Sequence, residues 1–189
     1  MKHITKLSKV KFQKGYTIIE LLTVAGILVV ISGLIAGILY STLRGSNKTK
    51  VSTSVAQNGT YALSVISDAV VSAYSVTAIN GTPITDCTAS PSGTIIALKK
   101  SDGSAISFSC ANNTIASGSA SLLDSSQVKI DTTNIANCYF YCYQPNNDPY
   151  STPIVGFGFT LTDKSTSTLL ENKSSSTFNT SVSLRNYRP

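Results

Sequence analysis

The hydrophobic pattern begins with an apolar run from Tyr16 to Tyr40, 25 residues that contain a single charged side chain, Glu20. About 20 apolar residues are enough for a helix to cross a bilayer core. An ordinary secretory signal has a shorter apolar core followed by a small-x-small cleavage site, and neither feature occurs here. The run therefore predicts a transmembrane helix. A carboxylate inside such a helix costs a few kcal/mol, so Glu20 is a candidate functional residue.

A second pattern follows the apolar run, with small and apolar residues at steps of three, four or seven. Such spacing places them on one face of an amphipathic helix. Gly45 and Gly59 each lower helix propensity by about 1 kcal/mol relative to alanine, but no proline occurs before Pro83. One continuous helix is therefore predicted from about Thr17 to Tyr74. Its buried stripe comprises Val51, Val55, Ala62, Ile66, Ala69 and Ala73.

Beyond Thr77 the chain becomes rich in Ser, Thr, Asn and Gly, with short runs in which apolar and polar residues alternate. This alternation predicts β-strands. Two such runs flank Asp102-Gly103, a pair that is typical of a hairpin turn. The loops between successive runs are too short for helical crossovers, so an antiparallel sheet is expected. Further strands are predicted at QVKI, NCYFYCY, IVGFGFTLT and FNTSVSLRN.

Together these patterns predict an α+β fold in which a long N-terminal helix packs on a C-terminal antiparallel sheet. The first half of the helix is the membrane segment and the second half is amphipathic. The expected parts are a leader, a transmembrane helix, its amphipathic continuation and a β-rich globular domain. Their boundaries are residues 1–15, 16–43, 44–76 and 77–189.

The formal net charge of +6 is concentrated at the start of the chain. Five of the 15 basic residues precede Gly15, which leaves ten against nine acidic residues. The remainder has no strong field for polyanions, so no nucleic-acid partner is expected. Basic residues beside an apolar span stay on the cytoplasmic side. The sequence therefore predicts a single-pass protein of the cell (inner) membrane with an extracytoplasmic C-terminal domain. The five residues are Lys2, Lys6, Lys9, Lys11 and Lys14.

The four cysteines would then lie in an oxidising compartment. Cys87, Cys110, Cys138 and Cys142 are an even set that predicts two disulfides. A zinc site is the alternative, but the spacing lacks paired C-x-x-C knuckles. In an extended CYFYC run the two cysteines lie about 13 Å apart at 3.3 Å per residue, beyond the roughly 7 Å limit between bridged Cα atoms. Cys138 and Cys142 should each pair with one of Cys87 and Cys110, and both such pairings remain open.

The residues needed for common catalytic sites are missing from the processed chain. The only histidine, His3, lies in the predicted leader, which excludes Ser-His-Asp and Cys-His catalysis and histidine metal sites after cleavage. There are also no paired acids at useful spacing, no glycine-rich phosphate loop and no nucleophile elbow. The sequence predicts no enzymatic activity, no cofactor and no metal.

Two surface motifs have more than one interpretation. Tyr139, Tyr141 and Tyr143 fall on one face of a strand, opposite the cysteines, where they form either an adhesive platform or a packing surface for the helix or a neighbouring strand. Packing is the commoner case. Lys99 and Lys100 beside the hairpin turn are either a solvated tip or a DNA contact, and two lysines neutralise few phosphates.

The N-terminus resembles a known family. A basic leader that ends in Gly15, followed by GYTIIELL at the start of an apolar helix, is similar to the signature of type IV pilins and type II secretion pseudopilins. The resemblance implies that a prepilin peptidase cleaves between Gly15 and Tyr16, and that the new amine of Tyr16 is methylated. It also implies that Glu20 pairs with the N-terminal amine of a neighbouring subunit. The alternative is that Glu20 extends to the cytoplasmic headgroups.

Two positions depart from the usual family pattern. The family usually has phenylalanine where Tyr16 stands, and many major pilins have a helix-kinking proline where Gly37 stands. The C-terminal half also resembles the sheet region of minor pilins and pseudopilins, several of which end on a strand that finishes in Arg-Asn. This likeness points to a minor subunit.

The resemblance implies a structural filament subunit that interacts with prepilin peptidase, with other pilin or pseudopilin subunits, with the inner-membrane assembly platform and with membrane lipid. The assembled filament would be periplasmic or on the cell surface. One alternative is a binding module at the filament tip, for adhesion, a secreted substrate or DNA uptake. Another is a single-pass membrane protein that never assembles.

Overall fold

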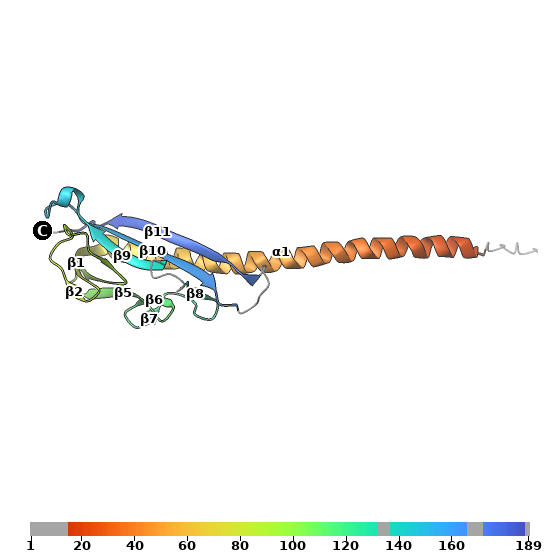
Figure 1. Cartoon of the computed structure of the whole chain (residues 1–189), viewed down its shortest axis with the longest axis horizontal. Helices are drawn as coiled ribbons and strands as arrows, with labels where there is room; N and C mark the ends of the chain where they lie inside the picture. The colour runs from red at the N-terminus through yellow and green to blue at the C-terminus, as the bar shows by residue number, and fades with distance from the viewer. Residues whose placement is uncertain (1–14, 132–136, 166–171, 188–189) are drawn as a thin grey trace, which may run out of the picture. The chain divides into compact units, whose positions relative to one another are not determined.

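The computed structural model describes residues 15–131, 137–165 and 172–187 (Figure 1). The chain divides into two compact units, Met1–Leu43 and Arg44–Pro189. The boundary falls inside one helix, α1 (Ile18–Ser72). The second unit contains the rest of α1 and all of the strands. The predicted α+β architecture is confirmed.

The Arg44–Ser72 part of α1 packs through the stripe that the sequence predicts. Val55, Ala62 and Ile66 are fully buried, and Ala69 is nearly so. The predicted helix end is slightly wrong, because α1 stops at Ser72 and Ala73–Ile79 forms strand β1. Ala73 is buried as expected, but it contributes to the core from a strand. The run AYSVTAI pairs with another strand, and this pairing outweighs continuation of the helix.

The strands form two antiparallel sheets, where the sequence suggests only one. The first sheet has six strands in the order β2-β1-β4-β5-β6-β7. The predicted hairpin is confirmed as β4 and β5, which pair from Lys99 with Ala105 to Ile95 with Ser109 around the turn at Gly103. Besides β1, this sheet contains β2 (Thr82–Pro83), β4 (Ile95–Lys100), β5 (Ala105–Ala111), β6 (Thr114–Ser117) and β7 (Ala120–Ser121).

The second sheet has five strands in the order β11-β10-β9-β3, with β8 paired to the far end of β10. The four strands predicted from alternating runs are all present in it. β10 is central, and it pairs with β9 over Ile154–Phe159 and with β11 over nearly its whole length. The bounds are β3 (Ser92–Gly93), β8 (Val128–Ile130), β9 (Cys138–Tyr143), β10 (Ile154–Asp163) and β11 (Ser175–Ser183).

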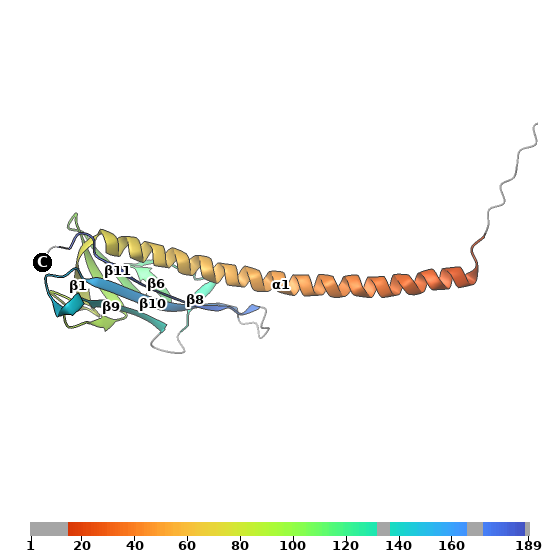
Figure 2. The ribbon, with the colours of Figure 1, turned by 90° about the horizontal axis from the view of Figure 1, so that it is seen from above.

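One hydrophobic core joins the two sheets to the Arg44–Ser72 part of α1, which lies along one side of them in Figure 2. The aromatic side chains of the second sheet point into it, with Phe157 opposite Phe140 and Phe159 opposite Phe178. We call this the inner face of the second sheet. Its other side, which carries the tyrosines of β9, is the outer face.

The helix and the second sheet meet at Gly59. A Cβ atom at this position would lie 2.2 Å from Cζ of Phe178, so any side chain there would collide with the ring. Glycine lowers helix propensity, and here it permits the ring to contact the helix backbone. The position that looks like a weakness in the sequence is therefore a packing site.

Candidate functional site

The first candidate site is the junction at which the helix begins. Gly15 and Tyr16 are exposed and precede the helix, so the predicted cleavage bond lies in non-helical backbone. Thr17 is the N-cap residue. Its hydroxyl accepts a hydrogen bond from the Glu20 amide at 3.3 Å, and the Glu20 carboxylate accepts one from the Thr17 amide at 3.4 Å.

This reciprocal arrangement is a capping box, which satisfies amide groups at a helix start that otherwise have no partner. The sequence interpretation missed it, although the signal, Thr-x-x-Glu before an apolar run, is visible in TIIE. Glu20 thus has a local structural role in addition to any role in assembly. Its carboxylate lies against the backbone amide and the hydroxyl of Thr17, the residue that follows Tyr16.

The Ile18–Leu43 part of α1 has no cover in the described structure, and each of its residues is exposed. Among the described residues, α1 is the one helix that is long and apolar enough to cross a membrane. Its exposed side chains include Ile18, Leu21 and Val29, which are 81%, 61% and 73% accessible. Contiguous apolar surface of this size marks a lipid or protein contact.

The cysteines form two disulfides, Cys87–Cys142 and Cys110–Cys138, with Cα atoms 5.4 Å and 6.1 Å apart. This confirms the prediction that Cys138 and Cys142 of β9 do not bond to each other but each form a disulfide with one of the two earlier cysteines. The second bridge connects β5 of the first sheet to β9 of the second. Because all four thiols are oxidised, they do not form the alternative zinc site. Among the described residues no cluster of three His, Cys, Asp or Glu could hold a metal ion.

The tyrosines of β9 are on the outer face, as the alternation predicts. Tyr141 lies opposite Gly156 and Tyr139 lies opposite Gly158 of β10. Each ring covers its glycine: a Cβ on Gly156 would be 2.0 Å from Cζ of Tyr141, and one on Gly158 would be 2.7 Å from Oη of Tyr139. The packing interpretation is thus confirmed for one side of the rings. Tyr139 nevertheless remains 37% exposed.

A buried amide that the sequence analysis missed organises the end of β9. Gln144 is 2% exposed, and its Oε1 accepts a hydrogen bond from the backbone N–H of Cys87 at 2.9 Å. Its Nε2 donates to the carbonyl oxygens of Pro149 and Ser151, each at 2.9 Å, and contacts the hydroxyl of Tyr187 at 3.2 Å. No sequence signal separates this glutamine from an exposed one, because its partners are distant or irregular backbone.

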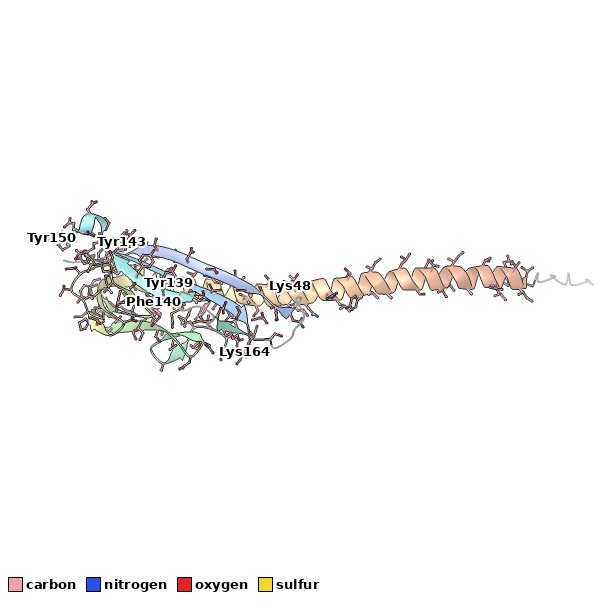
Figure 3. All side chains as sticks on the ribbon, in the orientation of Figure 1. Lys48, Tyr139, Phe140, Tyr143, Tyr150 and Lys164 are labelled. Carbon is pink, nitrogen blue, oxygen red and sulfur yellow. A yellow bond between two sulfur atoms is a disulfide. The ribbon has the colours of Figure 1, made fainter. Side chains whose placement is uncertain are left out.

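These bonds fix the loop QPNNDPYSTP between β9 and β10. Asn146 and Asn147 both have positive φ, at 56° and 53°, a region that non-glycine residues adopt at a cost unless the surroundings hold them there. Tyr150 projects from this loop and is 78% exposed. Figure 3 shows Tyr150 beyond the end of β9, with Tyr143 and Tyr139 along the strand.

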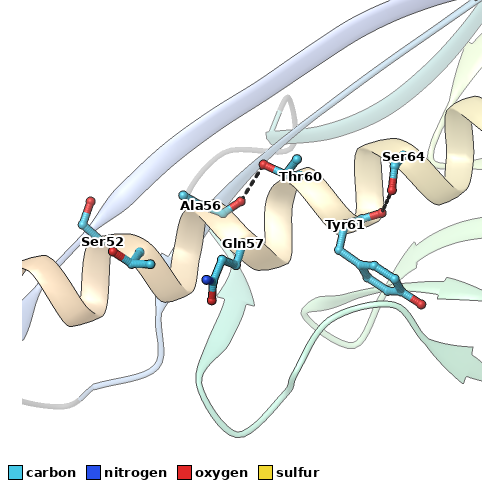
Figure 4. Close-up of a pocket in the computed structure, with 7 residues that line it drawn as sticks. Ser52, Ala56, Gln57, Thr60, Tyr61 and Ser64 are labelled. Carbon is cyan, nitrogen blue, oxygen red and sulfur yellow. Dashed lines mark hydrogen bonds between the residues drawn. The ribbon is translucent and has the colours of Figure 1, made fainter.

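A groove runs along the exposed side of α1 within the second unit (Figure 4). Two of its hydroxyl groups hydrogen-bond back to the helix: Thr60 donates to the Ala56 carbonyl at 2.8 Å, and Ser64 donates to the Tyr61 carbonyl at 2.9 Å. Apart from Gln57 and Tyr61 the lining side chains are small, so another helix could approach closely beside them. The residues that line it are Ser52, Thr53, Ala56, Gln57, Thr60, Tyr61 and Ser64.

Three aspartates, of which Asp102 and Asp124 are exposed and Asp86 is partly buried, form the same local motif. In each, the carboxylate accepts hydrogen bonds from the hydroxyl and the amide of the residue two positions later: Thr88 for Asp86, Ser104 for Asp102, and Ser126 for Asp124. The hydroxyl bond is the largest cause, and with the amide bond it holds the pKa of each carboxyl below its usual value. These motifs stabilise turns.

The hairpin tip that carries Lys99 is not simply solvated. Its ammonium group lies 5.7 Å from the centre of the Tyr74 ring, within the range of a cation–π contact. Both residues line a hollow beside the C-terminal segment with Asn186 and Tyr187. Arg185 and Asn186 follow β11 in a turn rather than ending it, which differs from the strand ending seen in the resemblance.

No protein-family description, curated protein or solved structure matches this chain.

Proposed function

We propose that the protein is a structural subunit of a type IV pilus or a type II secretion pseudopilus. It is made as a precursor, cleaved between Gly15 and Tyr16 by a prepilin peptidase, methylated at Tyr16 and assembled through Tyr16–Leu43. The single observation that carries the proposal is this uncovered apolar helix, which begins directly after an exposed Gly-Tyr junction and contains Glu20 as its only charge.

Two features of the apolar segment support this function. An apolar helix with every residue exposed needs lipid before assembly and other helices after it. The Glu20 carboxylate is directed toward the N-terminus, where cleavage creates a positive amine. Opposite charges in a low-dielectric place attract strongly, and either one alone is costly to bury, so pairing would fix the stagger of neighbouring subunits.

The disulfide-linked second unit supports an extracytoplasmic location, because disulfides persist in oxidising compartments. The small-residue groove on α1 gives neighbouring subunits a further packing surface within Arg44–Ser72. The partners of the protein are then the peptidase, the inner-membrane assembly platform and other subunits. The resemblance of the C-terminal half favours a minor subunit, which a count of this chain per filament would test.

Intact-mass analysis of the protein from membranes and from sheared filaments tests the proposal. We expect a mature chain that starts at Tyr16 with one added methyl group. Gly15→Leu should leave the full-length precursor in the membrane, and Gly45→Leu is the matched control that should be processed normally. A mature N-terminus beyond Tyr40 would remove the assembly helix and overturn the proposal.

A further inference from the structure

The outer face of the second sheet carries a surface that filament assembly through α1 does not use. We define the tyrosine face as the outer positions of β9, β10 and β11 around Tyr139, Tyr141 and Tyr143. The sheet turns its other side to α1, since Phe178 of the inner face packs on Gly59. The tyrosine face is therefore directed away from the helix.

The three rings form a continuous aromatic row. Tyr139 and Tyr141 have ring centres 6.2 Å apart and planes inclined by 24°; Tyr141 and Tyr143 are also 6.2 Å apart, inclined by 17°. This spacing is close to that of alternate residues on a strand, roughly 6.6 Å, so the rings lie in series along β9. β10 supports Tyr139 and Tyr141 from beneath through the two glycines, and this support holds their rotamers.

The positions beside the row on β11 and β3 are polar and uncharged, and Ile154 is the apolar side chain opposite Tyr143. Beside the glycines, β11 presents Ser183, Ser181 and Asn179 in register with Ile154, Gly156 and Gly158. On the other side of β9, Ser92 of β3 is paired with Tyr141. Tyrosine, serine, glycine and asparagine together are typical of binding surfaces, where rigid rings supply contact area and short polar groups supply hydrogen bonds.

The charge pattern distinguishes between classes of ligand. Among the described outer positions that pair directly with the three tyrosines, none is charged. The nearest charged residues lie at the two ends of this face. Asp131 donates its backbone N–H to the Thr160 carbonyl, two positions along β10 from Gly158, and Lys129 is paired with Thr162, about 13 Å from Gly158 at 3.3 Å per residue. Arg185 follows Ser183 by two residues at the other end, so the charges are one acid and two separated bases rather than a row of cations. Single-stranded nucleic acid needs cations that follow its backbone. A lipid or an apolar peptide would leave the Ser and Asn row without partners.

We propose that the tyrosine face binds neutral carbohydrate chains. A pyranose ring has an apolar C–H face that stacks on an aromatic ring and a rim of hydroxyls that hydrogen-bond to Ser and Asn side chains. A row of three rings suits successive sugar units of one chain. This inference goes beyond the proposed filament function and does not depend on it, since it concerns only the second unit.

The test uses the full chain in phosphatidylcholine nanodiscs, because sugar-based detergents would compete. The probes are neutral hexasaccharides of glucose with β-1,4, α-1,4 and β-1,3 linkages, and of N-acetylglucosamine, xylose and mannose, titrated by NMR or calorimetry. We expect saturable binding of at least one hexasaccharide. Tyr143→Ala should weaken it about threefold to tenfold, as expected for loss of one ring stack. Tyr143 pairs with Ile154, so this variant leaves both covered glycines intact.

Tyr61→Ala removes a tyrosine that is 58% exposed on α1, and should leave binding unchanged. Tyr139→Leu keeps an apolar cover on Gly158 and should also weaken binding. Binding to none of the six probes overturns the inference, as does binding that Tyr143→Ala and Tyr139→Leu leave unchanged. Binding of oligo-dT that Tyr143→Ala abolishes would identify a nucleic-acid site instead. Self-association that the same variant abolishes would identify a contact between copies. Both of these results would leave the proposed cleavage after Gly15 unaffected, so this inference can fail while the proposed function stands.

Discussion

The side-chain oxygen of Gln144 accepts a hydrogen bond from the backbone N–H of Cys87, 2.9 Å away and 57 positions earlier in the chain. The bond lies beside the Cys87–Cys142 disulfide, so a covalent bridge and a buried amide connect the same two segments. Every polar group of this amide has a partner. No buried side-chain nitrogen or oxygen in the described structure lacks a hydrogen bond.

Replacing this amide should be costly. Gln144→Leu removes the acceptor of the Cys87 N–H and the donor to the Ser151 carbonyl, and each buried polar group left unpaired costs about 1–3 kcal/mol. We expect a loss of about 2–4 kcal/mol in the free energy of unfolding in urea. Gln57→Leu, at an exposed position of α1, is the control and should change it by less than about 0.5 kcal/mol. Equal effects of the two variants would contradict the role given to Gln144.

Two glycines of α1 should respond in opposite directions to the same substitution. Gly59→Ala places a methyl group against the partly buried ring of Phe178, and overpacking of this kind costs about 1–3 kcal/mol. Gly45→Ala meets no atom within 4 Å and should stabilise the protein by about 0.5–1 kcal/mol through helix propensity. Thermal or urea unfolding of both variants measures the difference. Stabilisation by Gly59→Ala would show that the ring moves aside freely.

The two disulfides close loops of different length, which predicts their relative contributions. The bridge Cys87–Cys142 spans 55 positions and Cys110–Cys138 spans 28. The loop-entropy relation gives about 4.2 and about 3.6 kcal/mol respectively. We expect double serine variants to lose stability in that order under oxidising conditions. A non-reducing peptide map should show these two pairs, and a peptide joining Cys87 to Cys138 would contradict the structure.

The two roles of Glu20 can be separated by substitution. Glutamine can still form a capping box, so Glu20→Gln should keep the helix start while removing the charge. If the charge pairs subunits, this variant should insert and be cleaved normally but be depleted from sheared filaments. Thr17→Ala weakens the cap by about 1 kcal/mol and leaves the charge, so it should still assemble. Normal assembly of Glu20→Gln would instead assign Glu20 to the cap alone.

The aspartate turns predict an acid sensitivity with a definite sign. The carboxylate of Asp124 is stabilised by the Ser126 hydroxyl and amide, so its pKa is lower in the folded than in the unfolded chain. Its contribution to stability is present above the unfolded pKa, and it is lost as pH falls through the folded pKa. In an NMR titration, Ser126→Ala should move the Asp124 pKa upward, toward its usual value. Ser125→Ala is the control, and an unchanged Asp124 pKa in Ser126→Ala would reject the assigned cause.

The alternation and helical periodicity of the sequence determined most of the local structure. The apolar run, the stripe through Val55 and Ile66, the turn at Gly103 and the division of β9 into a tyrosine side and a cysteine side all follow from neighbours a few residues apart. The strand geometry of β9 even excluded a bridge between its own cysteines. These features depend on backbone periods of 2.0 and 3.6 residues, which local sequence encodes.

Tertiary structure alone decided the features that depend on distant partners. The choice of Cys142 over Cys138 for Cys87, the separation of the strands into two sheets and the end of α1 at Ser72 follow from register between segments far apart in the chain. The same is true of Gly59 and Gln144, which look like a helix weakness and a surface residue until Phe178 and the Cys87 amide are placed beside them. A residue's neighbours across the core contribute energies comparable to local propensity, and no short window of sequence contains them.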